Sequence, residues 1–387
     1  MRISNIDIHM PVRLAFATFA IVGCAWAQSG GGIGLPPPVT HKPTSPQQAG
    51  SAAIPPRGID PSSLEAAGLA GTTLANWSGS FVRSGTTYSY TMLGTNPALG
   101  SATTTVSAVL IPLKLIFSDG TVLDATAPIF GNSRSTEQLI EQSPLFQNVA
   151  FAPGGASVGT TQYIDAFQRA NFWNYVNTSA KNYHVRFQVT PMPVQTLTVP
   201  AYFGYTEAGP GSRIGYVDYN WWDGQLGVLL YRLNIQTSTL PMFVNYNILQ
   251  YSPDFTYAGY HTAFGNPAQV YLSAGFFDQG LFTYGGDIVF LSHELGESTD
   301  DPFVDNIVPS WSNPQTGGSC SDLLEVGDPV SDLGIGTYVV NGYSYHPEDL
   351  TFLPWFSGAM PSTSVNGWYT FGNNYSGPST CSGGSIR

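Results

Sequence analysis

The 387-residue sequence has few charged residues and very few basic ones. Asp, Glu, Lys and Arg make up 10% of the chain, and 13 Lys and Arg against 25 Asp and Glu leave a formal net charge of −12. Such a chain repels phosphate backbones and offers no basic amphipathic stretch to anionic lipid, so we expect neither partner. The abundant Gly and aromatic residues are instead typical of a globular protein rich in strands and loops.

Long apolar runs are absent beyond the N-terminus. The segment LAFATFAIVGCAWA (14–27) follows Arg2 and Arg13 and ends in a small-x-small sequence. These features predict a signal peptide (1–27) cleaved after Ala27, and therefore a secreted, extracellular protein without a stable membrane span. IVGC (21–24) also resembles a bacterial lipobox, so the alternative is a lipoprotein anchored at Cys24.

Cysteine is scarce, with three residues in the chain. If Cys24 is removed or lipidated, Cys320 and Cys381 remain as a pair in an exported protein. We therefore predict a disulfide between them, the alternative being two separate buried thiols.

Composition and periodicity divide the rest of the chain into two parts. Residues 28–69 are rich in Pro and Gly and predict a flexible linker, and residues 70–387 are predicted as a single domain and a monomer. Strands are predicted at 103–117, 183–190, 195–205, 242–251 and 268–277, and helices at 135–142 and 160–176. Because strands precede the main charged helix and irregular structure follows it, we expect a β-rich α+β fold.

That helix lies in VFLSHELGESTDDPFVDN (289–306), the segment richest in ionisable residues. Asp287 is predicted as its N-cap and Pro302 excludes its continuation, so we expect a helix over about 288–300. At about 100° per residue one face is apolar, while the opposite face presents His293, Glu297 and Asp300. Gly296 beside this face would let another segment approach closely.

His293 and Glu297 lie one helical turn apart, with Glu294 directly after the histidine. This is the layout of the zincin helix H-E-x-x-H with a carboxylate in the last position. The i, i+4 pair would bind a metal ion, and Glu294 would act as the catalytic base on metal-bound water. Zinc is the expected ion, and the carboxylate-rich set leaves Mn or Ca open.

Further ligands are expected from SCSDLLEVGDPV (319–330). We predict Glu325 as the third ligand, with Asp328 supporting the ligands from behind, as Asp300 and Asp301 would at the helix end. His261 is a second catalytic candidate, either as an oxyanion stabiliser or as a ligand. The alternatives are a structural histidine, a solvated helix face and an ordinary acidic turn.

SHELGESTDDP, together with the later EVGD (325–328), resembles a group of exported proteins that carry S-H-E-[LI]-x-E-x-x-[TS]-[DN]-P. The group occurs in bacteria and in the plant phosphate-induced/EXORDIUM family, and the resemblance covers residues 261–328. It implies an extracellular or cell-wall location and a zincin-like helix. His293, Glu294, Glu297 and the acidic pair within 325–328 correspond to its pattern.

The sequence thus predicts an exported metal-dependent hydrolase, a zincin-like peptidase acting on a peptide or cell-wall substrate. The alternative is a non-catalytic cell-wall or glycan-binding protein that holds a structural cation.

Overall fold

A computed structural model describes residues 26–27, 72–253, 255–282, 286–316, 318–331, 333–378 and 381. Most of the predicted signal peptide, Cys24 included, and the whole predicted linker lie outside these residues, so both stay predictions. In the described part of the chain, no helix has the length and apolar character needed to cross a membrane.

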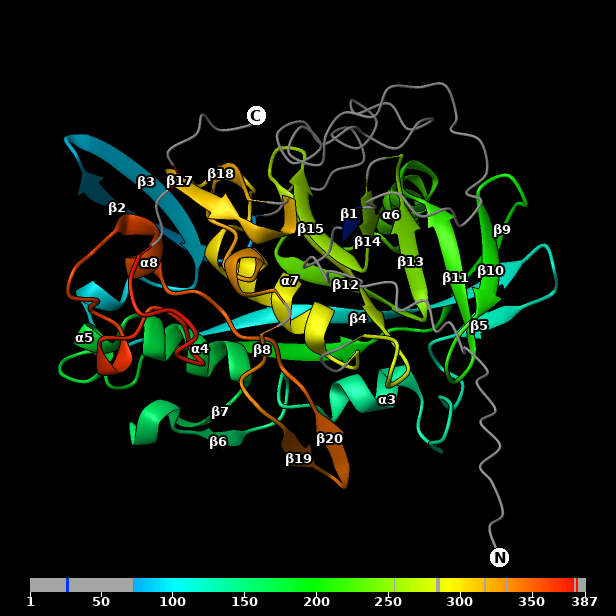
Figure 1. Ribbon diagram of the computed structural model, residues 1–387, viewed down its shortest axis with the longest axis horizontal. Helices are drawn as coiled ribbons and strands as arrows, with labels where there is room; N and C mark the ends of the chain where they lie inside the picture. Colours follow the sequence, from blue (N-terminus) through cyan, green and yellow to red (C-terminus); the bar gives the residue numbers. More distant parts are fainter. Residues whose placement is uncertain are drawn as a thin grey trace, which may run out of the picture.

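A mixed seven-stranded sheet forms the centre of the fold (Figure 1). Its strands are β4 (Thr103–Phe117), β5 (Val122–Asp124), β8 (His184–Pro191), β9 (Gln195–Val199), β12 (Thr239–Tyr246), β15 (Gly259–Phe264) and β16 (Gln269–Phe276). The long strand β4 has parallel neighbours on both sides, β12 on one and β8 followed by β9 on the other. β16 runs parallel to β12, and β15 closes that edge as an antiparallel strand.

A second sheet and several hairpins surround this centre. The five-stranded sheet contains β1 (Trp26–Ala27), β14 (Phe255–Tyr257), β13 (Ile248–Tyr251), β11 (Arg213–Asp218) and β10 (Gly204–Ala208). β1 belongs to the segment predicted as a signal peptide. The two-stranded pairs are β2 (Asn76–Arg83) with β3 (Thr86–Leu93), β6 (Val149–Phe151) with β7 (Gly159–Thr161), β17 (Ile307–Asn313) with β18 (Ser319–Leu323), and β19 (Tyr338–Val340) with β20 (Tyr343–Tyr345).

The α-helices are α3 (Thr136–Glu141), α4 (Tyr163–Asn171), α5 (Trp173–Val176), α6 (Tyr219–Leu233), α7 (Val289–Asp300) and α8 (Leu353–Ser357). Short 3₁₀ turns lie at Pro97–Leu99, Pro153–Gly155, Pro314–Thr316, Asp328–Val330 and Val365–Gly367.

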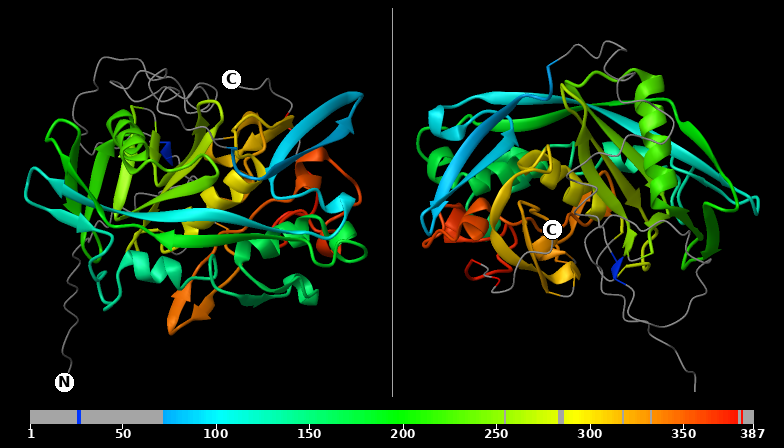
Figure 2. Two further views of the ribbon diagram at one scale, coloured as in Figure 1. Left: turned by 180° about the vertical axis from the view of Figure 1, so that it is seen from behind. Right: turned by 90° about the horizontal axis from the view of Figure 1, so that it is seen from above.

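The two faces of the central sheet bury two different cores, because successive strand residues point to opposite faces. Met242 of β12 and Leu272 of β16 pack in the core that contains α7. Their neighbours Phe243 and Tyr271 pack in the core that contains α6, around Trp222. α6 and α7 therefore lie on different sides of the same strands (Figure 2).

The predicted β-rich α+β fold is confirmed, and so are several of its elements. The 103–117 strand has the predicted bounds, and α3 lies within the predicted 135–142 helix, where Ser135 and Gln138 form a capping box. The single helix expected over 160–176 is instead interrupted at Phe172 between α4 and α5. The strands expected over 195–205 and 242–251 are each divided in two, the latter at Asn247, whose φ is 55°.

The predicted disulfide between Cys320 and Cys381 is also confirmed, with a Cα–Cα distance of 5.8 Å. Cys320 lies on β18, opposite Ser312 of β17. The bond therefore ties Cys381 to the strand that leads into the segment carrying Glu325 and Asp328.

Candidate metal centre

The charged helix α7 is buried along its whole length, from Val289 to Asp300. Its apolar side packs in the core against the sheet, and its ionisable side lies beneath β15 and the loop that follows β18. As expected, Gly296 allows another segment to approach closely. The Leu350 side chain lies so near that a Cβ at position 296 would be 2.7 Å from it. The ionisable groups of α7 are therefore held in the protein interior and not presented to solvent.

The start of α7 differs from the prediction. Ile288, not Asp287, occupies the N-cap position, and its side chain makes no capping hydrogen bond. The Asp287 carboxylate instead accepts from the backbone N–H of His346 at 3.0 Å and lies 2.7 Å from His346 Nδ1. This hydrogen bond raises the pKa of His346, which is engaged with Asp287 outside the cluster described next.

His293 is buried, and its two ring nitrogens face different partners. Nδ1 lies 2.6 Å from Oε2 of Glu348, whereas Nε2 faces Oε1 of Glu297 at 3.0 Å and Oδ1 of Asp328 at 3.5 Å. Although these oxygens are near, no hydrogen bond of acceptable geometry satisfies Nε2 among the described residues. An imidazole held through Nδ1 by a carboxylate, with Nε2 directed at other acids, is how proteins orient a metal-ligating histidine.

Glu348 was missed by the sequence-based prediction. Its backbone N–H donates to Ser292 Oγ at 2.9 Å, and the Tyr163 hydroxyl donates to its carbonyl oxygen at 2.5 Å. These bonds fix the loop after β20 against α4 and α7. No local spacing rule links Glu348 to a histidine 55 residues away, and an acidic residue in HPEDL (346–350) gave no further signal.

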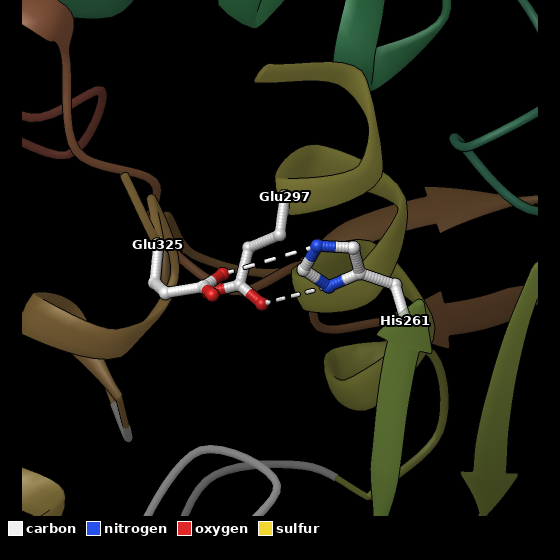
Figure 3. Close-up of side chains that lie close together, drawn as sticks. All are labelled: His261, Glu297 and Glu325. Atoms are coloured by element: carbon white, nitrogen blue, oxygen red, sulfur yellow. Dashed lines mark ion pairs between the residues drawn. The ribbon is translucent and has the colours of Figure 1, made fainter. Parts of the chain in front are cut away.

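His261 projects from β15 toward the same acids (Figure 3). Its Nδ1 lies 3.4 Å from Oε2 of Glu294 and 3.5 Å from Oε2 of Glu297. Its Nε2 lies 3.2 Å from the carbonyl oxygen of Asp301 and 3.9 Å from Oε2 of Glu325. That glutamate oxygen is buried and has no hydrogen-bond donor in the described part of the chain.

Glu297 lies between the two histidines. Its Oε1 faces His293 and accepts from the backbone N–H groups of Gly327 at 3.1 Å and Asp328 at 3.3 Å, while its Oε2 faces His261. A side chain at position 327 would overlap the His293 imidazole, so this close approach requires glycine.

The electrostatics of the cluster favour a cation. Burial, followed by the neighbouring carboxylates, raises the pKa values of Glu294, Glu325 and Asp328. Burial also disfavours ionisation of Glu297, but the two histidines outweigh it and hold the pKa of Glu297 below its usual range. Like charges held together away from water are unfavourable, and a bound divalent ion would relieve them.

Asp300 and Asp301, both predicted to support the ligands, have other partners. Asp300 accepts a hydrogen bond from Gln168 of α4, and burial raises its pKa to about 7. The Asp301 carboxylate accepts from the backbone N–H groups of Asp305 at 3.0 Å and Asn306 at 3.2 Å. Asp301 thus meets the cluster through its carbonyl oxygen, not its carboxylate.

Two sets of residues can each hold a metal ion: His293, Glu297 and Asp328, and His261, Glu297 and Glu325. The ligand atoms of each set lie within 4.8 Å of one another, and Glu325 and Asp328 are the members that are partly exposed. Atoms bound to one tetrahedral zinc ion at about 2.1 Å lie about 3.4 Å apart. The distances from His293 Nε2 to its two carboxylate oxygens, 3.0 and 3.5 Å, fit that value. Glu325, the predicted third ligand, thus lies on the His261 side, while Asp328, the predicted support, faces His293.

No protein-family model matches this chain, and neither a curated protein nor a solved structure does so. The resemblance to the phosphate-induced/EXORDIUM family therefore stays a prediction.

Proposed function

We propose that this protein is an exported metal-dependent hydrolase, a peptidase-like enzyme acting on a peptide or cell-wall substrate. The observation that carries the proposal is the unsatisfied Nε2 of His293. It faces two carboxylate oxygens at the spacing of metal ligands, while Glu348 holds the other ring nitrogen. Burial opposes protonation of His293, but Glu297 and Glu348 outweigh it and raise its pKa, so a metal ion would bind there by displacing a proton. A histidine and two carboxylates suit Zn²⁺, and Mn²⁺ after it.

The chemistry divides between the ion and Glu294. A catalytic ion lowers the pKa of its bound water toward 7, and a nearby carboxylate accepts the proton that this water releases. Glu294 follows His293 on α7, and its Oε2 lies 3.4 Å from His261 Nδ1 within the cluster, so it would be the carboxylate that accepts this proton. It would then donate the proton to the leaving group.

Access is easiest from the loop after β18. The side chains of Glu325 and Asp328 are 14% and 17% exposed, whereas those of His293 and His261 are 1% and 4% exposed. Water and substrate would therefore approach over that loop.

A pocket of about 430 Å³ lined by residues 72–76, 105–107 and Ser238 contains no ionisable side chain and is not part of the cluster.

The same burial favours a second candidate function. Structural metal sites are closed, whereas catalytic sites keep a position open to water. With both histidines and Glu297 almost fully buried, the ion would serve as a structural cation in a non-catalytic cell-wall or glycan-binding protein.

Metal analysis and two variants separate these functions. In Glu294→Gln we expect bound zinc to be retained and the hydrolysis of a mixed peptide library to fall by about 10²- to 10⁴-fold. His293→Ala should lose both metal and activity, while His346→Gln, outside the cluster, should keep both. A metal-bound wild-type protein that hydrolyses neither peptides nor cell-wall glycan would favour the structural cation. A chain that takes up neither Zn²⁺ nor Mn²⁺ would contradict both functions.

A further inference from the structure

We propose that the cluster is a dinuclear centre, in which Glu297 bridges two divalent ions. One ion would be held by His293 and Asp328, and the other by His261 and Glu325. The inference rests on the proposed function, since both require a metal ion in this cluster, and it adds a second ion and a bridging carboxylate.

The first argument is the orientation of Glu297. Its Oε1 lies 3.0 Å from His293 Nε2, and its Oε2 lies 3.5 Å from His261 Nδ1. A carboxylate whose two oxygens serve two different histidines has the arrangement of a bridge, with one oxygen for each ion. Ions bridged in this way lie about 3.5–4 Å apart in two-metal hydrolytic sites.

The second argument is that both histidines are oriented in the same way. Glu348 engages His293 Nδ1 and leaves Nε2 directed at Glu297 and Asp328. The Asp301 carbonyl accepts from His261 Nε2 at 3.2 Å and leaves Nδ1 directed at Glu294 and Glu297, while Glu325 Oε2 lies 3.9 Å from Nε2 at the edge of the same ring. A ring N–H that donates to a carboxylate or a carbonyl fixes the tautomer, so that the other nitrogen can bind metal. Two buried imidazoles are thus prepared as ligands from two different elements, α7 and β15.

The third argument is that each half of the cluster contains an unsatisfied buried atom. These atoms are His293 Nε2 in one half and Glu325 Oε2 in the other. Figure 3 shows the Glu325 carboxylate directed at Glu297 and His261, and its Oε2 has no hydrogen-bond partner among the described residues. One ion placed beside His293 would satisfy the first atom and leave the second without a partner, whereas two ions satisfy both.

Charge supports the same stoichiometry. Glu294, Glu297, Glu325, Asp328 and Glu348 bring five negative charges together when they are ionised. Two divalent ions balance four of these charges, whereas one ion balances two and leaves three uncompensated in a buried site. Glu294 Oε2, 3.4 Å from His261 Nδ1, lies beside the second position, where a base for bridging water would be needed.

Metal stoichiometry tests the inference on the full chain. We expect two zinc ions per chain after equilibrium dialysis, and one in each of His261→Ala and Asp328→Ala, with circular dichroism confirming that both variants fold. His346→Gln is the matched control and should keep two ions. One ion per wild-type chain would overturn the dinuclear centre and leave the proposed function standing, whereas no ion would overturn both. Two ions that persist in both variants would also overturn this assignment of ligands.

A second measurement needs no variant. The wild-type protein loaded with two equivalents of Mn²⁺ should give the electron paramagnetic resonance spectrum of an exchange-coupled pair, because a bridging carboxylate couples the two spins. Two independent six-line signals at the same loading would show separate ions and overturn the bridge.

Discussion

Two neighbouring residues of β15 point to opposite faces of the central sheet, and each contacts at least one acidic side chain. Tyr260 faces α6 and donates its hydroxyl to Oδ1 of Asp223 at 2.8 Å. His261 faces α7 and meets Glu294, Glu297 and Glu325. One strand thus contacts an acid that has hydrogen-bond donors on one face, and a group of acids that lacks enough donors on the other.

The two faces differ in the hydrogen-bond donors that surround their acidic side chains. Asp223 also accepts from the Tyr271 hydroxyl at 2.5 Å, and Trp222 Nε1 beside it donates to Ser273 Oγ at 3.1 Å, so these two polar side chains of the α6 face have protein partners. On the α7 face the carboxylates outnumber the donors, and the buried atoms without a hydrogen bond within the described structure include His293 Nε2, Glu325 Oε2 and Asp300 Oδ2. A buried carboxylate alone therefore does not indicate a metal site. A shortage of donors around several of them does.

Removal of metal should produce the largest difference between the two faces. Chelation is expected to lower the free energy of unfolding by about 3–4 kcal/mol, the stabilisation that a ligand at 100 to 1,000 times its dissociation constant provides. Calorimetric melting with EDTA, then with added Zn²⁺ or Mn²⁺, measures this loss and its recovery. Asp223→Asn on the α6 face should show the same response to EDTA as the wild type, and identical melting curves with and without EDTA would contradict the prediction.

Substituting alanine for one glycine near each face of the central sheet adds a single methyl group there and tests the comparison. Gly327→Ala should weaken metal affinity by about 10- to 100-fold, because the new Cβ overlaps the His293 imidazole and displaces it. Gly224→Ala on α6 meets nothing within 4 Å and should leave metal affinity unchanged while stabilising the helix by about 1 kcal/mol. Isothermal titration with Zn²⁺ and thermal melting measure both effects. Equal affinities in the two variants would be incompatible with His293 as a ligand.

Asp300 tests an acid on α7 that lies outside the cluster. Its pKa of about 7 in the folded chain, raised by burial, exceeds the unfolded value near 3.9. The folded state therefore binds this proton more tightly, and stability falls as the pH rises from about 4 to about 7. Asp300→Asn removes this dependence, and its amide can pair with Gln168, whose Oε1 has no described donor. We expect stabilisation on the order of 2 kcal/mol at pH 8 and much less at pH 5.

Denaturant unfolding at the two pH values, with metal present, measures the effect of this substitution. A stabilisation that does not change with pH would show that Asp300 does not titrate in this range.

Local patterns predicted the parts of the fold and the site that depend on neighbours in sequence. The 103–117 strand, the 135–142 helix and the i, i+4 placement of His293 and Glu297 depend on local sequence, and the disulfide followed from cysteine scarcity. The positions of Glu348 and Asp328 beside His293 depend on how loops fold over α7. No periodicity in the sequence predicts how these loops fold. Helix α6 went unpredicted because aromatic residues and Gly224 weaken its helical signal, and packing in the second core decides its conformation.

The burial of His293 and Glu297 also has a kinetic consequence. An ion bound by these side chains would leave past the loop after β18, the more exposed side of the cluster, so its residence time would depend on a local opening of the chain. The Cys320–Cys381 bond restrains the strand that leads into that loop. Exchange with dissolved metal should then be slow even at modest affinity, and the ion first captured during folding would be the one the protein keeps.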